Sequence, residues 1–128
     1  MNELDNINLI CITGLFLFYL PKIFYYKSFR ALVVFINGIL YHTNKNNTFL
    51  RNYDIYLNIL LICWTVYNYN YTIYTSLFVL ISFSINNYLN TKNYINENLS
   101  NIIHLSLVQF PLSISLKNTL IDEIKNIN

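Results

Sequence analysis

Apolar residues in this chain fall into five continuous blocks of fourteen to eighteen residues, separated by short polar stretches. The blocks do not alternate between polar and apolar positions, which favours helices over the strands of a barrel. Their lengths approach what a helix needs to cross a hydrocarbon core of about 30 Å at about 1.5 Å per residue. We therefore predict an all-α, polytopic bundle of about five transmembrane helices, forming a single domain over residues 1–128, with spans at 7–24, 29–42, 53–67, 71–88 and 99–116.

Three details of these blocks shape the predicted bundle. The block 29–42 is short, so it either gains length from Lys27 and Arg30, whose charged groups reach the headgroups, or forms a half-span against its neighbours. Only residues 68–70 separate the third block from the fourth, which predicts a tight antiparallel hairpin. Pro111 lies inside the last block and should bend it, or free a carbonyl for a neighbour to satisfy.

Composition supports the membrane interpretation and limits the possible partners. Charged residues make up 11% of the chain and hydrophobic residues 55%, too few charges to cover a water-exposed surface. The net charge of +2 comes from scattered Lys and Arg residues, so we expect no nucleic-acid partner. Asn, Ile, Tyr and Phe are abundant and are encoded by AT-rich codons, which points to a virus or another AT-rich genome as the source.

Lys and Arg residues are distributed unevenly between the two sides that five alternating spans define. The side that holds the N-terminus carries Lys45, Arg51 and Lys92, and the other side carries Lys22, Lys27, Arg30, Lys117 and Lys125. By the positive-inside rule, the side with more basic residues is cytoplasmic. We therefore predict an N-terminus outside the cytoplasm and a C-terminus inside it, in a host membrane if the source is a virus.

Two histidines and one acid approach the same side of the predicted bundle. His42 ends the second span, Asp54 begins the third, and His104 lies one to two turns into the fifth. Ionisable groups at membrane depth are costly and tend to pair or to mark a functional site. Two imidazoles and a carboxylate can bind zinc, which would let water attack an ester, amide or phosphate. The alternative is that these polar residues have no functional role and occur here because the ends of membrane spans contact water.

The two cysteines, Cys11 and Cys63, lie inside apolar blocks rather than in loops. That placement argues against a disulfide framework or a zinc knuckle. We interpret both as packing residues.

The run from Phe35 to Tyr67, FINGILYHTNKNNTFLRNYDIYLNILLICWTVY, resembles the second and third helices of alkaline ceramidases, which are seven-helix membrane hydrolases built around a zinc site. In that family an aromatic–His pair closes one helix and an Asp opens the next, and Tyr41-His42 and Asp54 hold those positions here. The resemblance implies that His42 ligates zinc and that Asp54 acts on the attacking water or holds the site.

The departures from that family are as informative as the matches. The matched run covers about a quarter of the chain, and the family's small hydroxyl residue one turn before the His is replaced in the region of Asn37 and Gly38. A late helix of the family supplies two histidines four residues apart, whereas here His104 is followed at that spacing by Val108. Lacking a third His ligand and two helices, the chain would be a shortened or inactive relative.

Three interpretations of function follow. The leading one is a multi-pass membrane protein with a structural or interaction role and no cofactor, in contact with the lipid bilayer and with a membrane-protein partner or a second copy of itself. The alternative is a reduced zinc-dependent lipid-amide hydrolase, with Asp54 as the catalytic residue and His42 and His104 as metal ligands. The third is a small channel, for which the fourth block offers only a patchy polar stripe.

Overall fold

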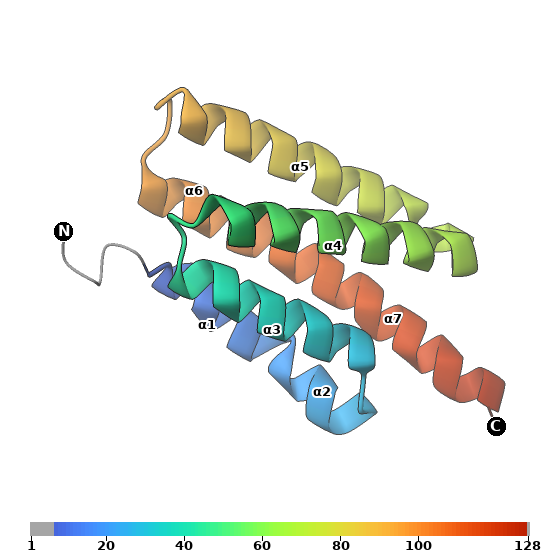
Figure 1. Ribbon diagram of the computed structural model, residues 1–128. Helices are drawn as coiled ribbons and strands as arrows, with labels where there is room; N and C mark the ends of the chain where they lie inside the picture. Colours follow the sequence, from blue (N-terminus) through green and yellow to red (C-terminus); the bar gives the residue numbers. More distant parts are fainter. Residues whose placement is uncertain (1–6, 128) are drawn as a thin grey trace.

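The computed structural model describes residues 7–127, which form helices joined by short turns and contain no strand. The elements are α1 (Leu9–Phe18), α2 (Leu20–Tyr26), α3 (Phe29–Thr43), α4 (Thr48–Asn68), the 3₁₀ turn η2 (Asn70–Thr72), α5 (Ile73–Thr91), α6 (Glu97–His104), the π-helical turn η3 (Leu105–Gln109) and α7 (Phe110–Ile127). They combine into five rods that run alternately in opposite directions (Figure 1). The predicted all-α class is confirmed. We call the end of the bundle where α1 begins end A, and the end where α7 finishes end B.

Two of the rods are long and apolar enough to cross a membrane: Leu9–Tyr26 and Glu97–Asn126. Phe29–Thr43 is apolar but shorter. The rods α4 and α5 have the length, but their many Asn and Tyr residues, together with Arg51 and Asp54 in α4, reduce their hydropathy. Helix length and composition therefore support two membrane-crossing helices, and the finer prediction of five spans needs a further argument.

Side-chain caps fix where several helices begin, because the first turn of a helix leaves backbone N–H groups without partners. Asn8, Ser28, Asn47 and Asn96 each accept a hydrogen bond from the backbone N–H three residues later. The Asn47 cap starts α4 five residues before the predicted boundary. Asp54 consequently lies in the second turn of its helix and not at the helix start, where the sequence analysis placed it.

Two irregularities divide the first and last rods. Pro21, in the first turn of α2, separates α1 from α2 at Tyr19 because proline lacks the N–H that a continuous helix requires. In the last rod the backbone widens into η3, where the Phe110 N–H bonds to the Leu105 carbonyl five residues back. The hydroxyl of Tyr19 donates to the Gln109 carbonyl at 3.2 Å, so a neighbouring helix supports the irregular turn just before Pro111.

Polar residues lie inside the bundle and large apolar residues lie outside it. Among the described residues eleven buried side chains are polar and seven are hydrophobic. Phe24, Tyr25, Phe29, Phe49 and Tyr67 are each more than 70% exposed, and exposed large hydrophobic residues of lower exposure occur on the other rods, including the last one. This distribution is the reverse of that in a water-soluble domain.

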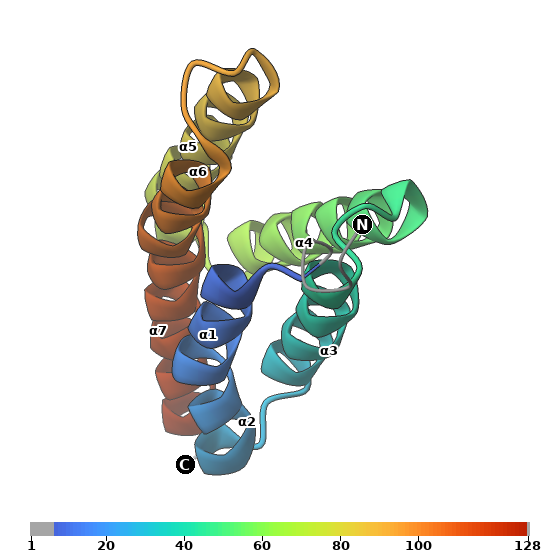
Figure 2. The ribbon, with the colours of Figure 1, turned by 90° about the vertical axis from the view of Figure 1, so that its left-hand side faces the viewer.

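The rods are not packed equally tightly. The helix α1 packs against α3, α6 and η3, and α5 packs against α6, η3 and α7, whereas α4 contacts mainly α3 and buries no residue. Figure 2 shows α5, α6 and α7 on one side, α3 on the other with α1 and α2 between them, and α4 diverging from α5 toward end A. The bundle is therefore closed where α4 and α5 meet at end B and looser at end A.

Candidate metal site

Three ligand-type side chains from three different helices meet near end A. The Cys11 Sγ and one ring nitrogen each of His42 and His104 all lie within 4.8 Å of one another. Cys11 comes from α1, His42 from the end of α3 and His104 from the end of α6. The two imidazole rings pack edge to face with centroids 5.8 Å apart.

Asn8 fixes the relative positions of the three helices that carry these residues. Its side chain accepts a hydrogen bond from the Cys11 backbone N–H at 3.2 Å, and its own backbone N–H donates to the His42 carbonyl at 2.7 Å. Its amide nitrogen also donates to the side chain of Asn101, one turn before His104, at 3.0 Å. A single residue thus links the start of α1, the end of α3 and α6.

The environment of His42 fits a metal ligand. Its side chain is almost fully buried, with 4% exposure, and within the described residues its Nδ1 has no hydrogen-bond partner. A buried polar atom without a partner is costly, and coordination of a metal would satisfy it. His104 is less buried and packs against the ring of Phe83.

The donor set suits zinc. Thiolate and imidazole are its preferred ligands, and ligand atoms around a tetrahedral zinc lie about 3.5 Å apart, given bonds of about 2.0 to 2.3 Å. Since the three atoms lie at most 4.8 Å apart, side-chain movements of about 1 Å would bring them to that separation. Three protein ligands leave one coordination position open, which is the pattern of catalytic rather than structural zinc sites.

Asp54 lines the same cavities as the two histidines but is not one of the three clustered ligands. Its carboxylate accepts a hydrogen bond from Asn58 Nδ2, one turn further along α4, at 3.2 Å. The structure therefore brings together His42 and His104, as alternation of the spans predicts, and places Asp54 on the wall of the cavity beside them.

Sequence reasoning missed Cys11, which it interpreted as a packing residue. Its position along the chain could have indicated the site. Cys11 lies at the start of the first span, and because successive spans alternate in direction, that start lies at the same end of the bundle as His42. Cys63, by contrast, is exposed and belongs to no such cluster among the described residues.

Two cavities meet at this site. A polar cavity of about 290 Å³ opens at end A, and its walls include Asn86, Asn87, Asn90 and Arg51. An apolar cavity of about 90 Å³ continues from it into the bundle. Both cavities are lined by His42, Asp54, Ile55, Phe83 and His104. The clustered ligands therefore lie where a polar compartment adjoins an apolar one.

No family model, curated protein or solved structure matches this chain. The resemblance to alkaline ceramidases therefore stays a prediction.

Proposed function

We propose that this chain is a five-span membrane protein that binds one zinc ion through Cys11, His42 and His104 and hydrolyses an amide or ester bond in a lipid. The observation that carries the proposal is the convergence of these three ligand-type side chains, with Asp54, where a polar and an apolar cavity meet. The resemblance of residues 35–67 to the ceramidase helices supports the same reaction class.

The distribution of side chains supports insertion in a bilayer. Apolar residues exposed on every rod would be unstable in water, whereas lipid solvates them. The polar residues face inward, where hydrogen bonds such as those between Asn86 and Ser100 satisfy them. For α4 and α5, this outward apolar surface is the argument for membrane insertion. The basic-residue count supports a cytoplasmic C-terminus, and a viral origin with a host membrane stays a prediction.

Each residue of the site has a proposed role. Cys11 and the two histidines would hold the metal, and Asn8 positions them by joining their helices. Bound zinc would supply Lewis acidity and lower the pKa of an attacking water. Asp54 accepts the proton of that water, and Asn58 holds the carboxylate in place. The apolar cavity takes up the acyl part of the lipid, and the polar cavity admits its headgroup and water.

The test uses the full chain purified in detergent. We expect about one zinc per chain by elemental analysis, and zinc-dependent release of a fluorescent acid from labelled lipid amides and esters. A preparation that binds no zinc, even after zinc is added, would contradict the proposal.

A structural zinc site is the second candidate function. The observation that favours it is that the three ligands come from α1, α3 and α6, so that a bound metal would tie the first and last rods together. Such a protein would bind zinc and lose thermal stability on chelation, without hydrolysing any lipid. It would agree with the structural or interaction role that the sequence favours.

A further inference from the structure

The turn η3 lies between two residues of the last rod that both reach Cys11. One ring nitrogen of His104, directly before η3, lies within 4.8 Å of the Cys11 Sγ. Gln109, the last residue of η3, donates from its side-chain Nε2 to the Cys11 backbone carbonyl at 3.2 Å. The last rod therefore contacts the sulfur and the carbonyl of a single residue of α1.

A regular α-helix could not direct both side chains toward α1. Successive residues of an α-helix point about 100° apart, so side chains five positions apart, like His104 and Gln109, would diverge by about 140°. In η3 the Phe110 N–H bonds to the Leu105 carbonyl five residues back, a pattern that takes up nearly one more residue per turn. This widening turns Gln109 back toward the face of the rod that carries His104.

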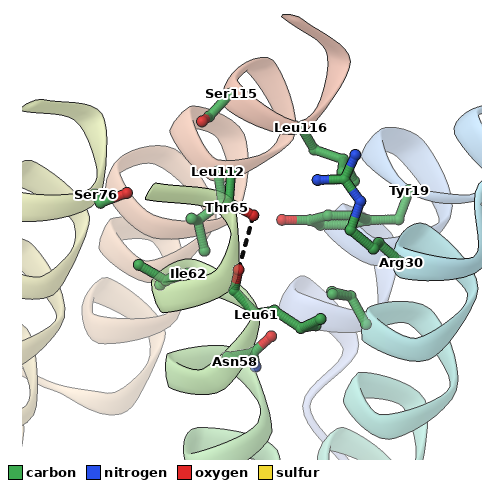
Figure 3. Close-up of a pocket in the computed structure, with 11 residues that line it drawn as sticks. Tyr19, Arg30, Asn58, Leu61, Ile62, Thr65, Ser76, Leu112, Ser115 and Leu116 are labelled. Carbon is green, nitrogen blue, oxygen red and sulfur yellow. Dashed lines mark hydrogen bonds between the residues drawn. The ribbon is translucent and has the colours of Figure 1, made fainter. Parts of the chain in front are cut away.

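The neighbouring residues explain why the turn is widened at this place. Pro111 has no N–H, and in a regular helix its ring would clash with the Leu107 carbonyl four residues back. The buried Tyr19 hydroxyl donates to the Gln109 carbonyl at 3.2 Å. Figure 3 shows the Tyr19 ring extending from the first rod into the bundle, where it lines a cavity together with Leu112 of α7. A proline in its own rod and a hydrogen bond from the first rod thus support η3.

The Gln109 side chain is better explained by its bond to Cys11 than by core packing. It is 5% exposed, and among the described residues its Oε1 has no hydrogen-bond partner. This oxygen lies against Gly14, where an added Cβ would overlap it. A buried amide oxygen without a partner costs free energy, and an apolar side chain of the same length would fill the space without that cost. The donor Nε2 is therefore the feature that favours glutamine at this position.

We propose that Gln109, directed by η3, is a positioning residue that holds Cys11 in register with His104. The Asn8–Asn101 hydrogen bond joins the same two rods one turn before His104, so the register is fixed on both sides of the histidine. The consequence for metal binding rests on the proposed function, whereas the register itself needs no metal. The two can therefore be tested separately.

Gln109→Met removes the donor and keeps the length of the side chain. The metal-free full chain in detergent is titrated with cobalt(II), which adopts zinc geometries and shows a thiolate-to-cobalt absorption band when a cysteine binds it. We expect the variant to weaken that band and to lower cobalt affinity about 10- to 100-fold, as losing a partner outside the coordination sphere does. Its thermal midpoint without metal should be unchanged or higher, because the unpaired amide oxygen is gone. An unchanged band and affinity would overturn the proposal.

Two further variants separate position from general packing. Gly14→Ala should displace the Gln109 amide and lower cobalt affinity in the same way. Leu120→Ala is the control, because Leu120 is a buried residue of α7 with 5% exposure that lies outside the metal cluster. It should lower the thermal midpoint and leave the cobalt spectrum unchanged. Equal losses of cobalt affinity in Leu120→Ala and Gln109→Met would mean that packing alone is responsible, which contradicts the proposal.

Deletion of Ser106 tests the widened turn itself. Ser106 is exposed and its hydroxyl bonds to the Ile102 carbonyl of the same rod. Removing one residue from η3 should restore a regular helix and abolish the thiolate-to-cobalt band. Ser106→Ala is the matched control, since it loses the same hydroxyl without changing the register, and it should keep the band. If the deletion keeps the band as well, η3 does not set the register.

A crosslinking experiment tests the register without metal. The variant C63S/H104C has thiols only at positions 11 and 104. A bifunctional thiol reagent with a short spacer should attach at the more exposed position 104 and then reach the buried Cys11, and mass spectrometry of the intact chain counts the bridges. Adding Gln109→Met should slow bridging several-fold, and adding Leu120→Ala should not. Bridging that does not depend on Gln109 would overturn the proposal. A chain that binds no cobalt but bridges in this Gln109-dependent way would contradict the proposed metal site and support the register.

Discussion

At the scale of single residues, the side chains of the candidate metal site have different proposed roles. Cys11 and His42 are buried candidate ligands, His104 is a more accessible one, and Asp54 lines the same cavity as the two histidines. Asn8 is outside this cluster and joins the three helices that carry it through hydrogen bonds. Substitutions can therefore separate metal binding, positioning and reaction chemistry.

Cys11→Ser tests the ligand that the sequence did not suggest. Loss of the thiolate should reduce zinc affinity by more than the roughly 10- to 100-fold typical of losing a partner outside the coordination sphere. Competition with a chromophoric chelator measures that affinity. Cys63→Ser is the matched control, since Cys63 is exposed and outside the cluster, and it should bind zinc like the unmodified chain. Equal zinc affinities for the two serine variants would show that Cys11 is not a zinc ligand.

Asp54→Asn tests the division between binding and chemistry. The amide cannot accept a proton, so hydrolysis should fall by about 10²- to 10⁴-fold, the usual contribution of a general base, while zinc stays bound. His42→Ala should lose both zinc and hydrolysis. Zinc content and lipid-amide turnover are measured on the same preparations. If Asp54→Asn hydrolyses lipid at the original rate, Asp54 is not the base.

At the scale of helices, the sequence predicted the number and order of the rods well, because long apolar blocks leave few alternatives to helix. It located boundaries less well where local caps decide them, as Asn47 does for α4. The π-helical turn η3 was not predictable, since it depends on contacts with α1 through Tyr19 and Gln109. Cys11 was missed for a similar reason: hydropathy places a residue along a span but does not say which neighbour it faces.

Gly38→Leu tests the close packing of α3 against α1. A Cβ at Gly38 would lie 2.6 Å from Leu15 Cδ1, and Leu15 is buried with 2% exposure, so either the Leu15 side chain or the two helices must shift. We expect a loss of about 1–3 kcal/mol, typical of an overpacked core, seen as a thermal midpoint lower by several degrees.

Val33→Leu adds bulk on the same helix at a partly exposed position and serves as the control. It should leave the thermal midpoint nearly unchanged. A similar decrease for both variants would mean that α3 does not use Gly38 to approach α1.

At the scale of the whole molecule, the bundle has two dissimilar ends. End A holds the candidate metal ligands and the polar cavity, where α4 and α5 diverge, whereas end B is closed by the α4–α5 hairpin and by the Arg30–Glu123 pair (Figures 1 and 2). If all five rods cross the membrane in the orientation that the basic-residue count predicts, the candidate metal site faces the side opposite the cytoplasm.

Labelling of introduced cysteines tests that orientation. Asn2→Cys and Asn126→Cys are made separately in a Cys63→Ser background, which keeps the buried Cys11 in place. An impermeant thiol reagent applied to sealed vesicles should label the two positions from opposite sides, with position 126 accessible from the cytoplasmic side. Labelling of both from one side would exclude an odd number of spans.

The hydrogen bond between Asn8 and Asn101 joins residues 93 positions apart, and the metal ligands beside them span the chain in the same way. During synthesis the first rod would therefore enter the membrane with Cys11 and the Asn8 amide still lacking their final partners. These groups remain available to assembly factors or to stray metals until the last rod leaves the ribosome. If the chain binds zinc as proposed, the metal would be loaded late in biogenesis, and a nascent chain stalled before residue 104 should expose Cys11 to thiol reagents that no longer reach it in the finished bundle.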